Sequence, residues 1–492
     1  MIWLQVERGP TSMMSFRKSL AWAYAGQIAS NLLTFVGSII VARLLSPHEM
    51  GIYAIAMATF GVFGIVSTFG TYSFIIREAE LAEEAVRTAY TINALIEVTL
   101  ALILIAFSFV AGAFFRDPGA ALVLRVAAVG PVLGALTFRA AAMMQRDLDF
   151  RRSTIISTLS ALIATAITVV SAYLGASYLS PAFGGLASAV TGIVGFTLTR
   201  PRDMIPHFSL TNWRPITAFG TRMLSIGGIQ TLCERCGEVA LGRILGLSAL
   251  GLYSRASSLD TLIYNQVYGT AGKVLFPQIA DEYRRTGKLH DPFVRNLRFL
   301  TALIVPMLFG LAVLSRPVIH ILYGEKWVQA AAPLSMLMIS QAVVMCYAMN
   351  WEIFVLKDET KLQARLEVSR SVFGLALFLY AATVSITAAA AARILTASIG
   401  LLLYAPYLRR FADLDSREFV RIALEAIGLG VLASGPALLL MLERHWDAGT
   451  PLTLMIPAVL LGGLFWLLAL FALGHPLSQE VLLIWRRVAS RR

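Results

Sequence analysis

Long apolar stretches of about twenty residues, separated by short polar segments, run through nearly the whole chain. A hydrocarbon core about 30 Å thick needs roughly 20 apolar residues per spanning helix, so each stretch predicts a transmembrane helix. Strands of a membrane β-barrel are shorter and alternate apolar with polar residues, which excludes that architecture. The pattern predicts an all-α polytopic membrane protein with about fourteen spans, at 20–42, 50–76, 89–115, 120–144, 153–174, 180–199, 216–243, 249–275, 296–322, 333–356, 371–388, 390–407, 420–442 and 451–473.

One part of this pattern occurs twice. The segment 41–53 returns as 241–253, so that Arg43 aligns with Arg243, and each copy joins two long apolar stretches. Because duplicated helix bundles are typical of transporters, the repeat predicts two pseudo-symmetric six-helix bundles around a central cavity. The expected organisation is an N-terminal extension (1–14), a first bundle (15–199), a cytoplasmic linker (200–215), a second bundle (216–407), an extra helix pair (408–473) and a basic cytoplasmic tail (474–492).

Composition and charge agree with a membrane location. The 492 residues are 57% hydrophobic and 14% charged, which excludes a soluble enzyme, and the net charge of +12 raises the question of a nucleic-acid partner. Most of the 41 Lys and Arg residues lie in the even-numbered loops and the termini; the odd-numbered loops hold only Arg43, Arg116, Arg243, Arg316, Lys326, Arg393 and Arg444. This asymmetry follows the positive-inside rule and predicts that both termini are cytoplasmic. It explains the charge as membrane topology, so no nucleic-acid partner is expected.

Polar side chains inside the predicted spans recur at helical spacing. In the first span they are Gln27, Asn31, Thr34 and Ser38, in the seventh Gln230, Glu234 and Glu238, and in the eighth Ser254, Ser258, Thr261, Asn265 and Tyr268. Steps of three and four place each set on one helix face, which should line water or a neighbouring helix. Charged groups accompany them within spans: Arg222, Arg235, Arg255, Asp260, Arg125, Arg139, Glu97 and Glu352. Each such charge costs about 2.5–3.5 kcal/mol to insert and therefore needs a reason.

Five ordered motifs carry a family resemblance. They are 42–53 (ARLLSPHEMGIY), 145–152 (QRDLDFRR), 242–253 (GRILGLSALGLY), 275–277 (LFP) and 323–327 (YGEKW). With them the chain resembles, from about Ser15 to beyond Leu473, the polysaccharide transporter family of flippases, within the multidrug/oligosaccharidyl-lipid/polysaccharide superfamily. One departure is Glu238, where members of the family often carry Asp.

The resemblance implies a function. It implies export of undecaprenyl-pyrophosphate-linked oligosaccharide repeat units across a bacterial inner membrane, for surface or exopolysaccharide synthesis. The implied partners are this lipid-linked saccharide, membrane lipids, a polysaccharide polymerase and the chain-length machinery. No catalytic residue, metal or organic cofactor is expected, apart from a coupling proton or sodium ion.

Two roles are then predicted for the charged residues. Guanidinium groups meet phosphate oxygens bidentately and stay charged, which suits a diphosphate head group. The expected substrate-binding residues are Arg222, Arg235, Arg255, Arg125 and Arg139, and the expected ion-coupling carboxylates are Glu234, Glu238 and Asp260. Purely structural pairing is the alternative, because Arg235 and Glu238 stand at i and i+3. Arg43 and Arg243 are expected to anchor turns.

Two other functions remain open on the sequence. A drug/cation antiporter of the same superfamily would need an acidic, aromatic pocket, whereas the inventory here holds at least as many Arg as carboxylates. A membrane-embedded glycan polymerase or ligase would need a substantial outer loop, and the outer loops are short. The six histidines lack metal-ligand spacing, Cys233 and Cys236 lie within one predicted helix, and no phosphate-binding Gly-Lys loop occurs.

Overall fold

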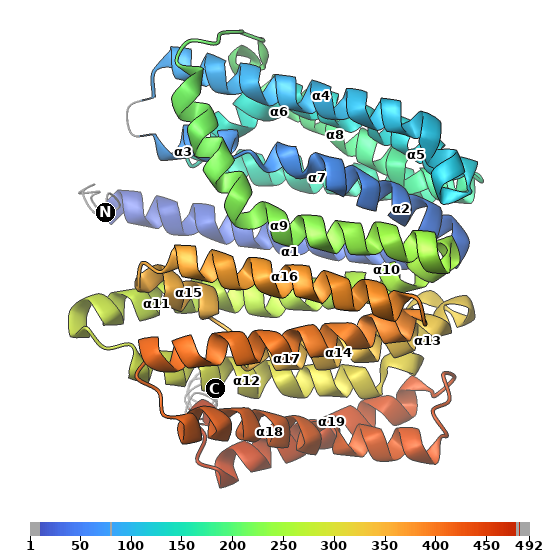
Figure 1. Ribbon diagram of the computed structural model, residues 1–492, viewed down its shortest axis with the longest axis vertical. Helices are drawn as coiled ribbons and strands as arrows, with labels where there is room; N and C mark the ends of the chain where they lie inside the picture. The colour runs from blue at the N-terminus through green and yellow to red at the C-terminus, as the bar shows by residue number, and fades with distance from the viewer. Residues whose placement is uncertain (1–9, 79–80, 479–481, 483–492) are drawn as a thin grey trace. The chain divides into compact units, whose positions relative to one another are not determined.

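The computed structural model describes residues 10–78, 81–478 and 482, with 10–25, 68, 222–227, 270 and 273–274 described by backbone alone. Across these residues the chain forms 19 α-helices and no strand, which confirms the predicted all-α class (Figure 1). The helices fall into two compact units, Met1–Arg243 and Ile244–Arg492. The N-terminal extension and the basic tail lie largely outside the described residues. The central cavity stays a prediction.

The first unit consists of helices that pack in neighbouring layers. Helix α7 packs against α1 and α8, and α6 packs against α4 and α8. The helices are α1 (Pro10–Leu44), α2 (Pro47–Phe63), α3 (Thr71–Arg77), α4 (Glu83–Phe115), α5 (Pro118–Ala127), α6 (Val129–Arg146), α7 (Phe150–Tyr173), α8 (Ser180–Thr199) and α9 (Trp213–Leu245), the last crossing the division. Ile75, Tyr90 and Phe138 form a buried cluster where α3, α4 and α6 meet, and Ile216 and Phe219 of α9 join it. Helix α1 begins at Pro10, five residues before the expected start at Ser15.

The second unit has its own core. Helix α14 packs between α12 and α17, and α18 packs against α12 and α19. The helices are α10 (Leu247–Ile263), α11 (Gly269–Thr286), α12 (His290–Val313), α13 (Ser315–Tyr323), α14 (Ala331–Met345), α15 (Asn350–Leu356), α16 (Thr360–Ala382), α17 (Ile386–Phe411), α18 (Ser416–Glu443) and α19 (Leu452–Ala472). Tyr323 and Trp327, from one of the family-like motifs, are fully buried against each other between α13 and α14.

The sequence repeat is also a structural repeat. Helices α2 and α10, which begin inside the two copies of the motif, are each 17 residues long. Both then lose α-helical geometry at aligned positions: Gly64–Thr68 forms a 3₁₀ turn and Tyr264–Tyr268 a π-helical turn. The entries into the two helices differ, because Ser46 and Glu49 form a capping box whereas Gly246 uses a positive φ of 89°. Interruptions of this kind concentrate at functional sites.

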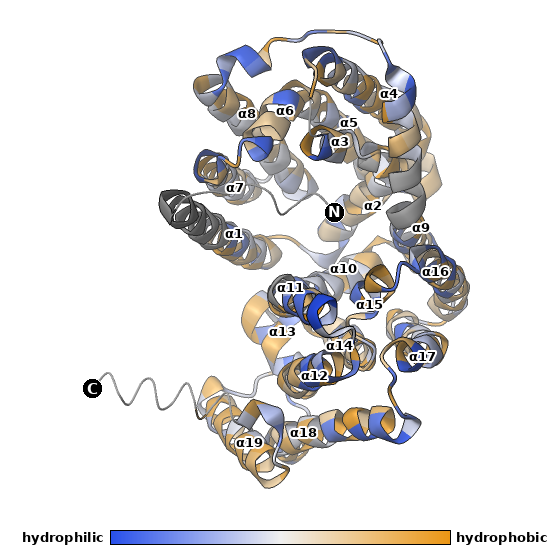
Figure 2. Cartoon of the chain, turned by 90° about the vertical axis from the view of Figure 1, so that its left-hand side faces the viewer, coloured by the Kyte–Doolittle hydropathy of each residue, from blue (hydrophilic) through white to orange (hydrophobic). Residues whose placement is uncertain are grey.

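Eleven helices among the described residues are long and apolar enough to cross a membrane. Many large apolar side chains are exposed along these helices. In Figure 2, α19 is coloured mainly in the orange of hydrophobic residues. Three further predicted spans fall on α9, on α10 with α11, and on α16, which are helical and carry more polar residues. The expected break at 388–390 is wrong in position. It lies at 383–385, where the Ser385 hydroxyl caps α17 by accepting from the backbone N–H of Ala388.

Candidate functional site

Helix α9 presents the charged face that the sequence predicts. We call Gln230, Glu234, Arg235 and Glu238 the α9 charged face. The Gln230 amide donates to Glu234 at 3.2 Å, and Arg235 Nη1 donates to Glu238 at 2.8 Å. Arg235 therefore makes the i, i+3 pair of the structural alternative, yet its side chain stays 43% exposed against 25% for Glu238. A half-exposed guanidinium has five N–H donors, so the pair leaves donors for an anionic ligand.

Helix α2 holds the Arg235 side chain in place. A Cβ at Gly61 would lie 2.8 Å from Arg235 Cδ and 2.9 Å from Nε, closer than carbon atoms pack. Gly61 thus forms a slot across which the arginine stem runs. Gly64, one turn further, has no such neighbour, since its nearest side-chain atom would be 3.5 Å away. Because Gly61 has no side chain, the Arg235 side chain can occupy this position against α2.

The polar stripe of α1 lies beside the face that packs on α7. Gly26 and Gly37 approach threonine side chains of α7, and Ser30 donates to Thr158 at 3.2 Å. Gln27, Asn31 and Ser38 each follow one of these contact residues in the sequence. The polar stripe is therefore rotated by about 100° around the helix from the face that contacts α7. Gln27 donates to Asn31 at 2.9 Å. Thr34 and Ser38 bond backbone carbonyls of their own helix, leaving the two amides as the groups with further capacity.

Two of the predicted arginines have other surroundings. Arg125 is exposed, donates through Nε to Ser108 at 3.1 Å and lies 5.1 Å over the exposed ring of Phe109. Arg139 is 12% exposed and binds Glu83 at 2.8 Å and Asp203 at 3.3 Å. The structure therefore commits Arg139 of α6 to an ion network with the start of α4 and the 3₁₀ turn Pro201–Met204. The Arg222 side chain lies outside the described residues.

In the second unit the predicted stripe of α10 does not continue with a regular period. Ser254 and Ser258 donate to backbone carbonyls of their own helix, at 2.8 and 2.6 Å. Thr261 is exposed, and the π-helical turn that follows contains Asn265 and Tyr268 and changes the register there. The expected continuous stripe is thus interrupted because a π turn adds one residue per turn. Arg255 lies 6.0 Å from the Tyr323 ring, and Asp260 is half-buried.

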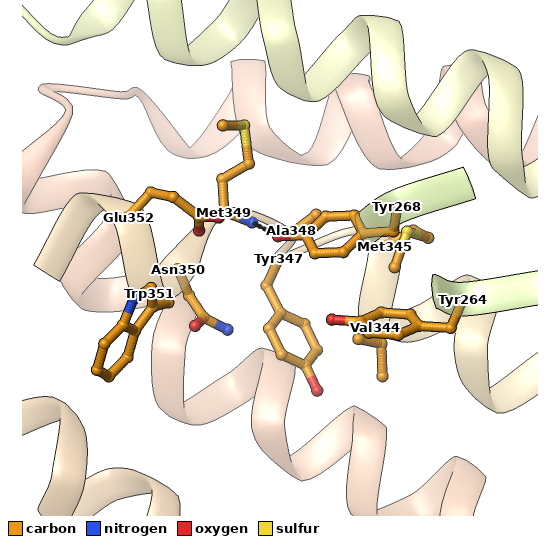
Figure 3. A pocket seen from close by; sticks show the side chains of 10 residues that line it. All are labelled: Tyr264, Tyr268, Val344, Met345, Tyr347, Ala348, Met349, Asn350, Trp351 and Glu352. Atoms are coloured by element: carbon orange, nitrogen blue, oxygen red, sulfur yellow. Dashed lines mark hydrogen bonds between the residues drawn. The ribbon is translucent and has the colours of Figure 1, made fainter. Parts of the chain in front are cut away.

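A cavity of about 270 Å³ opens within the second unit where two helices are interrupted opposite each other. One interruption is the π turn, and the other separates α14 from α15 at 346–349. Met349 there has a positive φ of 65°, and its N–H donates to the Tyr268 hydroxyl at 3.0 Å. We call this cavity the tyrosine pocket; it is lined by Tyr264, Tyr268, Val344, Met345, Tyr347, Ala348, Met349, Asn350, Trp351 and Glu352 (Figure 3).

The sequence indicated only two lining residues of this pocket, Tyr268 as part of a stripe and Glu352 as an intramembrane charge. No Gly or Pro marks the break at 346–349, so the pattern gave no signal for it. Trp351 and Asn350 stand next to the predicted charge, and only the helix break turns them toward the cavity. Figure 3 shows Glu352, Asn350 and Trp351 on one side and the two tyrosines of the π turn on the other.

An internal ion pair that the sequence analysis missed adjoins this pocket. Arg370 Nε donates to Glu367 at 3.2 Å and its Nη2 makes a second, shorter bond, while Tyr404 donates to the same carboxylate at 2.8 Å. We call Glu367, Arg370 and Tyr404 the α16–α17 clasp. Tyr347, which lines the pocket, stacks on Tyr404 with ring centroids 5.6 Å apart. Glu367 and Arg370 are 24% and 19% exposed, so the pair is largely desolvated.

Comparison with known proteins places this geometry in a family. Residues 40–332 match the family model described as "Polysaccharide biosynthesis protein". The chain is 25% identical over 330 residues to the succinoglycan biosynthesis transport protein ExoT of Rhizobium meliloti, covering 66% of each chain. It is 25% identical over 323 residues to the lipopolysaccharide biosynthesis protein WzxC of Escherichia coli, covering 64% of this chain and 65% of that protein. The matches span slightly less than two thirds of these relatives' length.

Solved structures share the fold. An inward closed lipid II flippase MurJ superposes with a TM-score of 0.72 at 15% identity, covering 91% of this chain and 97% of that one. An inward-facing MATE family multidrug resistance transporter superposes with a TM-score of 0.60 at 13% identity, covering 79% and 96%. The relative from Rhizobium meliloti is named as a transport protein, which agrees with the expectation of a transporter. The chain belongs to the polysaccharide biosynthesis protein family.

Proposed function

We propose that this protein is a flippase that exports undecaprenyl-pyrophosphate-linked oligosaccharide repeat units across the bacterial inner membrane, by alternating access. The observation that carries the proposal is the α9 charged face in a chain of this family. It offers a half-exposed guanidinium within a membrane helix, held by Gly61 and oriented by Glu238. Such an arrangement fits an anionic head group, because Arg forms bidentate, charge-assisted hydrogen bonds with phosphate.

The carboxylates of the α9 charged face supply a route for coupling transport to an ion gradient. When a phosphate binds Arg235, it competes with Glu238 for the same guanidinium. Glu238 then shares this guanidinium with the phosphate, which weakens its ion pair with Arg235 and favours binding of a proton or sodium ion. Glu234 stands one turn away, where Gln230 donates to it. We infer that Glu234, Glu238 and Asp260 link cargo movement to an ion gradient in this way. We propose that both termini are cytoplasmic, because the distribution of Lys and Arg follows the positive-inside rule.

Deletion of the gene in its host tests the proposal, with analysis of surface glycans and lipid-linked intermediates. The proposal expects loss of the polysaccharide and accumulation of intact, undecaprenyl-linked repeat units. Complementation by the wild-type gene should restore export. Unchanged polysaccharide together with altered drug sensitivity would instead identify a drug/cation antiporter. New glycosidic bonds formed by the purified protein would identify a polymerase or ligase.

A further inference from the structure

The tyrosine pocket contains a carboxylate that needs hydrogen-bond donors. Glu352 is half-buried within a membrane-spanning segment, and its Oε2 atom is buried without a hydrogen-bond partner among the described residues. An ionised carboxylate only accepts hydrogen bonds, and leaving it unpaired away from water is costly. A rotation of the Glu352 side chain that turns this oxygen into the cavity, toward a ligand that brings donor groups, removes that cost. The pocket is therefore built to receive something polar.

Four aromatic side chains also line the pocket, from Tyr264, Tyr268, Tyr347 and Trp351. Tyr264 and Tyr268 stack with ring centroids 5.0 Å apart and an interplanar angle of 23°. Trp351, on the opposite side of the cavity in Figure 3, is 48% exposed, and Asn350 beside it offers both a donor and an acceptor. Aromatic side chains present a large apolar face with a polar tip. A ligand that fits must have an apolar face and a rim of hydrogen-bonding groups.

A pyranose ring has this combination, with C–H groups on its faces and hydroxyl groups around its edge. We propose that the tyrosine pocket binds one pyranose ring of the saccharide cargo, with Glu352 accepting hydrogen bonds from its hydroxyls and Trp351 covering one face. This inference rests on the proposed function and adds a sugar subsite in the second unit. The cavity of about 270 Å³ suits one ring, since pockets for larger ligands start near 300 Å³.

A bound metal cation fits the pocket less well. The described residues contain no group of three or more His, Cys, Asp or Glu side chains that could hold a metal. A volume of 270 Å³ also far exceeds what a single ion requires. The pocket residues Asn350, Trp351 and Glu352 stand shortly before the loop at 357–359. The charge distribution predicts that this loop is cytoplasmic, which is the side from which the cargo comes.

The test is ligand-observed NMR with the purified full-length protein in nanodiscs. Saturation-transfer difference spectra would be recorded with methyl glucoside, methyl galactoside, methyl mannoside and N-acetylglucosamine. We expect ring-proton signals from at least one sugar, reduced at least threefold by Glu352→Gln and by Trp351→Leu. The matched control is Glu359→Gln, an exposed carboxylate in the adjoining loop, which should keep the wild-type signal. Trp351 is half-exposed, so its replacement leaves the fold intact and provides a second, independent variant.

Several outcomes overturn the inference. They are no signal from any of the four sugars, equal signals in the wild type and Glu352→Gln, or thermal stabilisation by sodium ions that disappears in Glu352→Gln while no sugar binds. Complementation of the deletion strain separates this failure from failure of the proposed function. If the wild-type gene restores export but the sugars do not bind, the subsite is wrong and the flippase stands. If deletion of the gene leaves the polysaccharide unchanged, the proposed function itself fails.

Discussion

Replacing Gly61 by alanine tests whether the position of Arg235 matters, without removing any functional group. The new Cβ would lie 2.8 Å from Arg235 Cδ. Carbon atoms pack at about 3.5–4.0 Å, so the arginine stem must move by about 0.7 Å or more. Because the clash is with a flexible side chain, the stability cost should stay below about 1 kcal/mol, under the usual range for overpacking.

The effect on export should be much larger than the effect on stability. A hydrogen bond to a charged group contributes about 1.5–3 kcal/mol, and each 1.4 kcal/mol is a factor of ten. If displacement of Arg235 weakens its bonds to the cargo phosphate by that amount, export should fall by about 10- to 100-fold. Gly61→Ala should therefore lower the rate strongly while the protein level and thermal stability stay near the wild type.

The assay is complementation of the deletion strain with quantified surface polysaccharide, beside immunoblotting of membrane fractions. Gly64→Ala is the control, because a Cβ there meets its nearest side-chain atom at an ordinary 3.5 Å. It should complement fully. Wild-type export by Gly61→Ala, at equal protein level, would refute the reasoning that the Gly61 slot positions Arg235 for the cargo.

Three further predictions concern Arg235, the α16–α17 clasp and the buried His475. Arg235→Gln should abolish export at normal protein abundance, measured by glycan analysis and immunoblotting, and normal export would remove Arg235 from the site. Arg370→Leu should destabilise the protein by about 3 kcal/mol, because it leaves the Glu367 carboxylate largely buried without its counter-charge; adding Glu367→Gln should recover most of the loss in thermal melting, and no recovery would contradict a coupled pair. His475 is 1% exposed, and burial together with the nearby Arg298 charge lowers its pKa to about 4. Its protonation should therefore favour unfolding as the pH falls from about 6.5 to 4, by up to about 3 kcal/mol; His475→Asn should flatten the pH profile of the melting temperature over this window, and an unchanged profile would contradict that assignment.

The sequence predicts most of the fold because lipid imposes simple rules. The lengths of the apolar stretches predict the helices. The repeat that aligns Arg43 with Arg243 predicts that α2 corresponds to α10, and the bounds of the two helices align residue for residue. The start of α16 was not predicted, because Lys361, Arg365 and Arg370 lower the hydropathy of a segment that is helical from Thr360. Hydropathy identifies a helix as a span only when the helix carries few polar residues.

The candidate site was predicted in part. Glu234, Arg235 and Glu238 share a helix, so the period of 3.6 residues sufficed to put them together. The tyrosine pocket was not predictable, because it depends on the helix break at 346–349, which no Gly or Pro announces. Arg139 shows the opposite limit: its partner Asp203 lies far along the chain, and no periodicity connects them.

The central claim is that the protein moves a lipid-linked saccharide across a bilayer, and a translocation assay with purified protein tests it most directly. Proteoliposomes would carry a fluorescent undecaprenyl-pyrophosphate-linked saccharide in both leaflets, and an impermeant quencher or glycosidase would report the outer leaflet. We predict that wild-type protein renders the inner-leaflet lipid accessible, and that Arg235→Gln does so no faster than protein-free liposomes. Equal rates for wild-type protein and protein-free liposomes would contradict the claim.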